Sequence, residues 1–130
     1  EKGIDIETFT AKGTSVIPEL ENVFACTSFG GWNTNRGVFV LPGSGISFPM
    51  QVFVKDVIKL DNSSSVIVFE AGDYTLTVSY VKTPNVKQGD IVKSGTKLFT
   101  GVTGNPVVPG TALMFIVKNG KFINPVFMCR

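Results

Sequence analysis

The chain has 130 residues, with 12 basic and 10 acidic side chains and a formal net charge of +2. This length fits one domain, and 43% hydrophobic against 17% charged residues supports a folded core rather than a disordered chain. The small net charge gives no reason to expect a nucleic-acid partner. The sequence contains no histidine, which excludes Ser-His-Asp and Cys-His catalysis and histidine-ligated zinc for this chain alone.

Short segments rich in Val, Ile, Phe and Thr, separated by 14 glycines and seven prolines, predict an all-β domain. No segment has helical periodicity. The expected strands, in chain order, are Gly3–Glu7, Ser15–Ile17, Asn22–Thr27, Val38–Leu41, Gln51–Leu60, Val66–Glu70, Tyr74–Val81, Lys97–Val102, Ala112–Lys118 and Lys121–Ile123. Val86–Gly95 is expected to be a loop, and the slip in apolar alternation after Val54 predicts a β-bulge.

Two hairpins are the clearest local features. The first joins Val66–Glu70 to Tyr74–Val81, where apolar Tyr74, Leu76, Val78 and Tyr80 alternate with Thr and Ser, so one face is expected to be buried. The second has Asn119-Gly120 at its tip, the strongest short hairpin signal.

The middle of the chain, Ser28–Ser65, holds three turn-rich stretches that flank two possible strands. Nothing separates it as a second domain, so one domain over residues 1–130 is expected, and the start at Glu1 suggests a mature product or a piece excised from a longer protein. Cys26 and Cys129 fit either one disulfide in an oxidising compartment or two buried free thiols.

Three groups of residues are candidates for function. Glu1 and Asp5 would share one side of a strand, as an acid pair or metal site or simply as an exposed strand end. Trp32, beside two glycines, is either a ligand-stacking platform or a core residue. Val86–Gly95 has the glycine spacing seen in biotinyl and lipoyl carriers, but the Asn119-Gly120 hairpin tip carries no lysine to be modified.

Several motifs along nearly the whole chain resemble the lysostaphin/LytM-type zinc peptidases of bacterial cell walls, the M23 family. Gly3–Ile6 is similar to the H-x-G-x-D motif, and Ala112–Val117 is similar to H-L-H-F-E-V. Tyr74–Val81 resembles the strand that ends in A-H-L, and Lys118–Lys121 with Asn124-Pro125 matches the closing hairpin and its exit. The resemblance implies an antiparallel β-sandwich of the LytM, or duplicated-hybrid-motif, type with an elongated middle segment. This segment, Arg36–Ser65, is longer than the corresponding loop of compact family members, and it either folds over the former cleft or forms a partner surface.

The resemblance also shows which functional residues are missing. At the three zinc-ligand positions this chain has Glu1, Asp5 and Met114, and at the two catalytic-histidine positions it has Tyr80 and Ala112. Catalytic zinc needs about three strong protein ligands, and a thioether is a poor ligand for Zn²⁺. We therefore expect no zinc, no other cofactor and no peptidase activity, with apolar packing in place of the old groove floor.

These inferences predict a catalytically inactive LytM-like domain. It is expected to lie outside the cytoplasm of a bacterium, in the periplasm or cell envelope, as a regulator or binding partner of a cell-wall hydrolase or an active LytM-type relative in cell shape or division. The alternative is a peptidoglycan-binding module that uses the vestigial groove, with Trp32 as a wall residue. A residual hydrolase based on Glu1 and Asp5 is the enzyme hypothesis, and it predicts activity that Asp5→Ala abolishes.

Overall fold

The computed structural model describes residues 16–27, 37–43, 45–60, 63–103, 106 and 108–130. These residues form an almost entirely β structure with two short 3₁₀ helices, and none of their helices is long and apolar enough to cross a membrane. In chain order the elements are η1 Pro18–Leu20, β1 Gly37–Val40, β2 Val52–Lys59, β3 Ser65–Ala71, β4 Tyr74–Pro84, β5 Ile91–Val92, β6 Phe99–Val102, β7 Ala112–Lys118, β8 Lys121–Ile123 and η2 Pro125–Met128.

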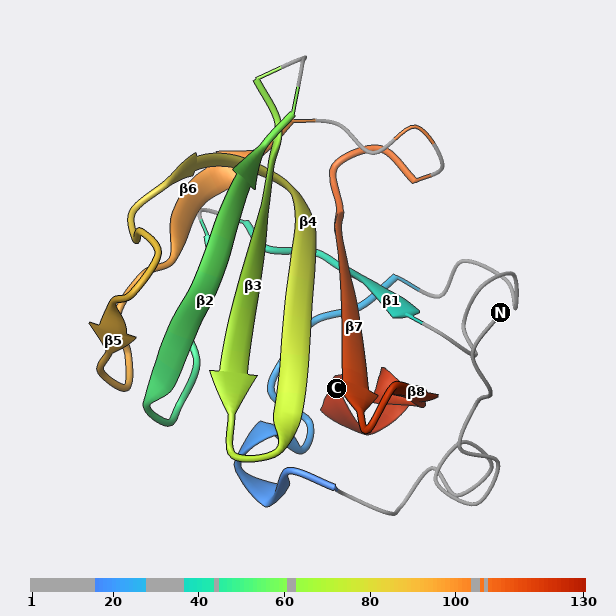
Figure 1. The fold of residues 1–130 in the computed structure, drawn as a ribbon. Coiled ribbons are helices and arrows are strands. Elements are labelled where there is room, and N and C mark those ends of the chain that lie inside the picture. Colours follow the sequence, from blue (N-terminus) through green and yellow to red (C-terminus); the bar gives the residue numbers. More distant parts are fainter. Residues whose placement is uncertain (1–15, 28–36, 44, 61–62, 104–105, 107) are drawn as a thin grey trace.

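All of the strand pairings are antiparallel, in the order β1-β7-β4-β3-β2-β5, with β6 added to β4 and β8 added to β7 (Figure 1). The long strand β4 pairs with two strands along the same edge: its first part pairs with β7 and its last part pairs with β6. Figure 1 shows β4 curving away from β7 toward β6, so the sheet folds over itself and encloses a core. The predicted antiparallel all-β fold is confirmed.

Both predicted hairpins are present. Gly72 has φ of 60° in the turn between β3 and β4. Asn119 and Gly120 have φ of 53° and 77° between β7 and β8, the two positive values that a type I′ turn requires. The turn residues therefore fix these two registers locally.

The predicted irregularity in the second long strand is also confirmed. The register of β2 against β3 shifts between Val54 and Asp56, where the fully buried face of β2 ends. The loop expected over Val86–Gly95 is wrong in one detail, because Ile91–Val92 forms the short strand β5 against the start of β2.

The strands predicted before residue 28 are wrong wherever the structure describes them. Pro18 begins η1, and Asn22–Thr27 forms single bridges instead of a strand, from Phe24 to Cys129 and from Cys26 to Val40. Proline fixes its own φ and lacks a backbone N–H, so it suits the first turn of a helix better than a ladder. Gly3–Glu7 lies outside the described residues.

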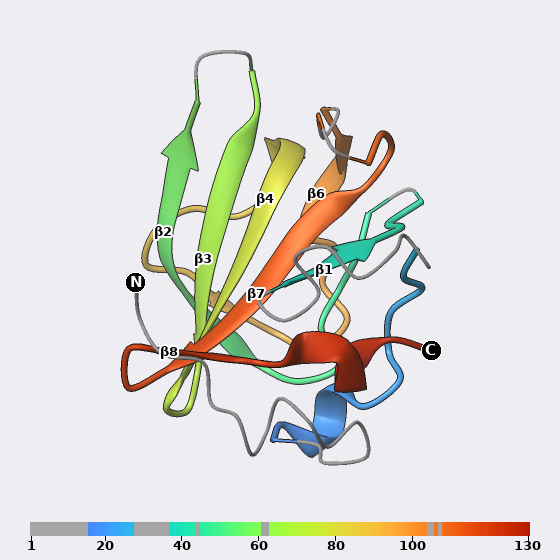
Figure 2. The same cartoon turned by 90° about the vertical axis from the view of Figure 1, so that its right-hand side faces the viewer.

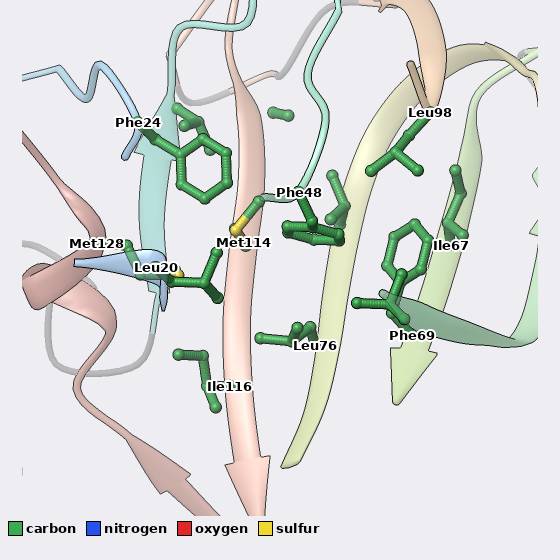
Figure 3. Packing of buried hydrophobic residues seen from close by; sticks show 14 of the residues in the cluster. Leu20, Phe24, Phe48, Ile67, Phe69, Leu76, Leu98, Met114, Ile116 and Met128 are labelled. Carbon is green, nitrogen blue, oxygen red and sulfur yellow. The ribbon is translucent and has the colours of Figure 1, made fainter. Parts of the chain in front are cut away.

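One face of the folded sheet supplies the core. Leu76, Val78 and Val81 of β4, with Ile67 and Phe69 of β3, have no exposed surface. Figure 3 shows these strands facing the side chains of a covering layer formed by the chain before β1, the loop before β2 and η2. Burial of this apolar surface is the main term that stabilises the fold.

Candidate functional site

Three of the predicted site residues lie on two paired strands. In the β4–β7 register Val78 pairs with Met114, and the last pair is Ser79 with Leu113. Tyr80 and Ala112 follow that last pair, one on each strand, where β4 leaves β7. Figure 2 shows β4 and β7 side by side. Glu1, Asp5 and Trp32, the other predicted residues, lie outside the described residues.

Ala112 and Met114 lie on the core side of β7. Both side chains have no exposed surface, and so does Ile116, two residues further on. The residues between them, Leu113 and Phe115, are only half-buried. The face that carries Ala112 and Met114 is thus sealed from solvent, whereas the opposite face of β7 is partly accessible.

Aromatic and aliphatic side chains from three segments cover Met114. Figure 3 shows Leu20, Phe24 and Met128 on one side of Met114 and Phe48 on the other. The ring centroid of Phe48 lies 6.1 Å from that of Phe24 and 5.1 Å from that of Phe69, with both pairs in edge-to-face geometry. These contacts form a continuous apolar layer over the strands.

Phe48 belongs to the long middle segment that the sequence singled out. Its loop is anchored by backbone bonds, since the Gly95 amide donates to the Phe48 carbonyl at 2.9 Å and the Leu98 amide donates to the Ile46 carbonyl at 2.9 Å. The middle segment therefore contributes one fully inserted aromatic ring to the cover of the β4–β7 face.

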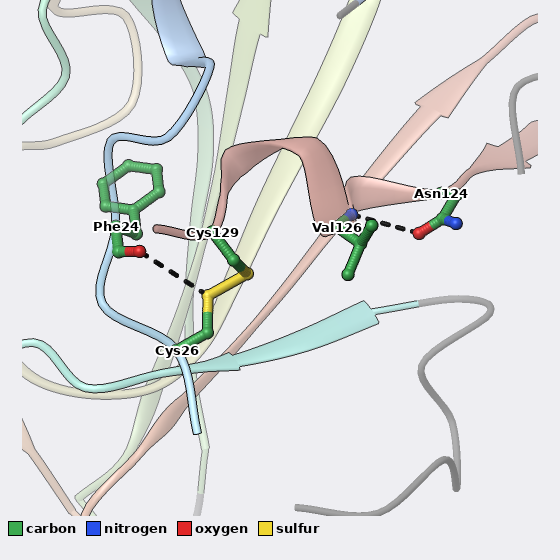
Figure 4. Close-up of a disulfide and its surroundings, with 5 residues drawn as sticks. All are labelled: Phe24, Cys26, Asn124, Val126 and Cys129. Carbon is green, nitrogen blue, oxygen red and sulfur yellow. Dashed lines mark hydrogen bonds between the residues drawn. A yellow bond between two sulfur atoms is a disulfide. The ribbon is translucent and has the colours of Figure 1, made fainter. Parts of the chain in front are cut away.

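The rest of the cover is fastened by the disulfide between Cys26 and Cys129, whose Cα atoms are 5.5 Å apart (Figure 4). Around it, the Phe24 amide donates to the Met128 carbonyl at 2.8 Å, and the Arg130 amide donates to the Phe24 carbonyl at 2.8 Å. The choice between a disulfide and two free thiols is thus settled in favour of the disulfide.

The 3₁₀ helix beside the disulfide has its own cap. The Asn124 side chain accepts a hydrogen bond from the Val126 amide at 3.0 Å, and Pro125 occupies the first helical position (Figure 4). This cap fixes the direction in which the chain leaves β8 and places η2 over the core.

Tyr80 departs from the predicted alternation. Its φ is 65°, its side chain is half-buried, and the fully buried position passes to the next residue, Val81. The expectation that Tyr80 continues the buried series of Leu76 and Val78 is therefore wrong. The irregular backbone coincides with the point where β4 leaves β7 and turns toward β6, and the Tyr80 carbonyl accepts a bond there from the Thr103 amide at 3.1 Å.

The donor atoms at these positions do not fit a zinc ion. Alanine offers no ligand, a thioether is a poor ligand for Zn²⁺, and neither residue reaches solvent. Over the described part of the chain, no group of three His, Cys, Asp or Glu side chains is placed to hold a metal. The arrangement of Tyr80, Ala112 and Met114 supplies packing, and we derive no catalytic step from it.

The opposite face of the same two strands is partly accessible to solvent. There Ser79 lies across from Leu113, and Thr77 lies across from Phe115. The sequence carries a signal for this face in the alternating Thr and Ser residues of β4. Since residues paired across two strands point to the same face of the sheet, the polar residues of β4 identify the accessible side of β7. In this register Leu113, rather than Met114, faces the accessible side.

Comparison with known proteins identifies the fold. No protein-family profile and no curated protein sequence matches the chain. Among solved structures it is similar to a putative M23 peptidase from Pseudomonas aeruginosa, with a TM-score of 0.63 and 14% identity over 98% of this chain and 54% of that one. It is similar to LytU, with a TM-score of 0.58 and 22% identity over 80% and 79%. It is also similar to a chain in the SpoIIIAH and SpoIIQ complex, with a TM-score of 0.55 and 17% identity over 81% and 87%.

These similarities define the class of fold. The domain has the β-rich fold of M23/LytM-type peptidases, as the sequence motifs implied. All three identities are below 25%, so the likeness concerns architecture. The chain spans about half of the Pseudomonas protein and 32% of Helicobacter pylori Csd3, another structural neighbour.

Proposed function

We propose that this chain is a catalytically inactive LytM-like domain that binds another protein outside the cytoplasm, in the periplasm or cell envelope of a bacterium. The proposed partner is a cell-wall hydrolase or an active LytM-type relative, and the proposed role is regulation of that enzyme in cell shape or division. In this proposal residues 1–130 act as one domain and require no cofactor.

The observation that carries the proposal is the absence of histidine from a chain with an M23-like fold. Without imidazole groups the domain lacks the commonest zinc ligand and the commonest proton-transfer group in proteins. The proposed vestigial positions Tyr80, Ala112 and Met114 supply a phenol, a methyl group and a thioether. Neither of the latter two can activate water.

Two further observations support a binding role in an extracytoplasmic compartment. One structural neighbour belongs to a complex between two proteins, SpoIIIAH and SpoIIQ, so a domain of this architecture is compatible with protein–protein assembly. The disulfide between Cys26 and Cys129 is of the kind that persists in oxidising compartments.

The proposal is tested by three measurements on the purified protein. Metal analysis after incubation with zinc is expected to give well under one equivalent, and a peptidoglycan hydrolysis assay is expected to give no product beside an active M23 enzyme. Affinity capture from envelope extract of the native host is expected to retain a cell-wall hydrolase. Stoichiometric zinc with hydrolysis that Asp5→Ala abolishes would overturn the inactive assignment, and failure to retain any envelope protein would overturn the binding role.

The peptidoglycan-binding alternative rests on Trp32 and is separated by sedimentation with purified sacculi. Pelleting of the wild-type chain that weakens in Trp32→Ala would support wall binding. A chain that stays in the supernatant would eliminate this alternative and leave the protein partner.

A further inference from the structure

A cavity of about 400 Å³ lies beside the turn of the β3–β4 hairpin, and neither Tyr80 nor Ala112 lines it. Residues of the segment around η1 and of the turn between β3 and β4 line the cavity. The lining residues that matter here are apolar Ile17, Met50, Ala71 and Tyr74, and acidic Glu19 and Asp73.

The two carboxylates come from different segments, since Glu19 belongs to η1 and Asp73 to the hairpin turn. Both side chains are exposed, and neither makes an ion pair in the described part of the chain. Among the described residues that line the cavity there is no Lys or Arg. The site therefore combines an apolar wall with two exposed carboxylates.

Tyr74 lines the cavity with a ring that already contacts a cation. The ammonium group of Lys118 lies over it, with Nζ 5.1 Å from the ring centroid. The ring is therefore not counted as a site for a ligand, and it is the two carboxylates of Glu19 and Asp73 that favour a cationic ligand.

We infer that this cavity receives a lysine side chain of the partner protein. The aliphatic stem of lysine would pack against the apolar wall while its ammonium group stays near water between the two carboxylates. An acidic side chain would meet like charge, and a purely aliphatic one would leave both carboxylates without a counter-charge. This inference rests on the proposed protein-binding function and gives it a location.

The direct test uses a peptide titration followed by amide chemical shifts. The probe is acetyl-Gly-Ala-Lys-Ala-Gly-amide, and its comparison is the same peptide with norleucine, which keeps the stem and removes the charge. The lysine peptide is expected to shift the amides of Gln51, Gly72 and Asp73, and these shifts should weaken in 0.5 M salt. The norleucine peptide should shift them much less.

Matched variants locate the effect. Glu19→Gln and Asp73→Asn are each expected to weaken lysine-peptide binding by about twofold to fivefold, as for exposed ion pairs. Glu21→Gln, which changes an exposed carboxylate two residues from Glu19 outside the cavity lining, should leave it unchanged. Absence of shifts, shifts elsewhere, or equal responses to the lysine and norleucine peptides would overturn the inference.

A second readout separates this inference from the proposed function. If the double variant E19Q/D73N still captures the same envelope protein as the wild type with equal yield, the cavity is not the lysine site, although protein binding stands. If neither form captures a partner while the lysine peptide still binds the cavity, the protein-binding function fails, and the cavity remains a cation-recognising site whose partner assignment is wrong.

Discussion

Exchange of neighbouring residues in β7 for histidine tests which face of the strand is sealed. Met114 has no exposed surface, whereas Leu113 is half-buried on the other side. M114H removes an apolar side chain worth about 1.5–3 kcal/mol of burial and leaves an imidazole without a partner, at a further cost of about 1–3 kcal/mol. We expect a total loss of about 3–5 kcal/mol at pH 7.5, against less than about 1.5 kcal/mol for L113H.

The two variants should also differ in their response to pH. Burial at position 114 disfavours the charged imidazole, so its folded-state pKa falls below the unfolded value of about 6.5. A depressed histidine pKa means that the unfolded state binds more protons as the pH falls, so stability is lost below about pH 6.5. Between pH 7.5 and pH 5.5 the extra loss for M114H approaches about 1.4 kcal/mol, and L113H should show little.

Urea unfolding at the two pH values measures both effects, with the wild type as reference for any change in other groups. If M114H loses no more stability than L113H at pH 7.5, or gains no additional sensitivity at pH 5.5, the sealed face has been assigned to the wrong side of β7. The pair thereby tests the orientation of β7 as well as the packing of the core.

Three further substitutions or treatments give separate expectations. Reduction of the disulfide, which closes a loop with a sequence separation of 103, should lower the free energy of unfolding by up to about 4–5 kcal/mol, and equal urea midpoints with and without reductant would contradict this. Phe48→Ala should cost about 3–5 kcal/mol in the same assay, whereas Phe53→Ala, at a position 40% exposed, should cost much less; similar losses would refute the proposed packing. Gly45→Ala should be strongly destabilising, because φ is +122° and a Cβ would lie 2.3 Å from the Phe99 carbonyl oxygen, while Gly43→Ala, with φ of +58° and open space, should cost only about 1 kcal/mol in thermal unfolding. A Gly45 variant as stable as the Gly43 variant would show that the loop lies elsewhere.

The parts of the fold that could be predicted from sequence are those whose geometry is decided locally. Asn119-Gly120 specifies its own turn, and the alternation through Leu76 and Val78 specifies the buried face of β4. Two-residue β5 could not be predicted, because Ile91–Val92 becomes a strand only through its pairing with β2.

In the segment before β1, the composition predicts a strand that the structure does not form. Asn22–Thr27 has the composition of a strand, but its partners are η2 and β1, and each contact is a single bridge or an isolated hydrogen bond. Such an arrangement depends on residues about a hundred positions away in the sequence, including the partner of Cys26. Composition alone cannot distinguish it from a ladder.

Prediction of the candidate site from sequence was limited by the composition of β7. Ala112–Val117 is apolar at every position, so alternation along β7 cannot identify the inner face. The absence of histidine, in contrast, is visible in the sequence itself and needs no register. The assignment of Tyr80, Ala112 and Met114 to a former groove stays a prediction.

The disulfide also determines how the domain would carry mechanical load. Tension that enters at residue 16 and leaves at residue 130 passes directly from Cys26 to Cys129, so the sheet between them bears none of it. With the disulfide intact, only the short segment before Cys26 can extend under tension, to a length of roughly 35 Å. With the bond reduced, the same pull is resisted first by the bridge between Phe24 and Cys129, and its loss allows a chain of roughly 350 Å to unravel from both ends of the sheet. One covalent bond thus separates a nearly inextensible link from a long, extensible one.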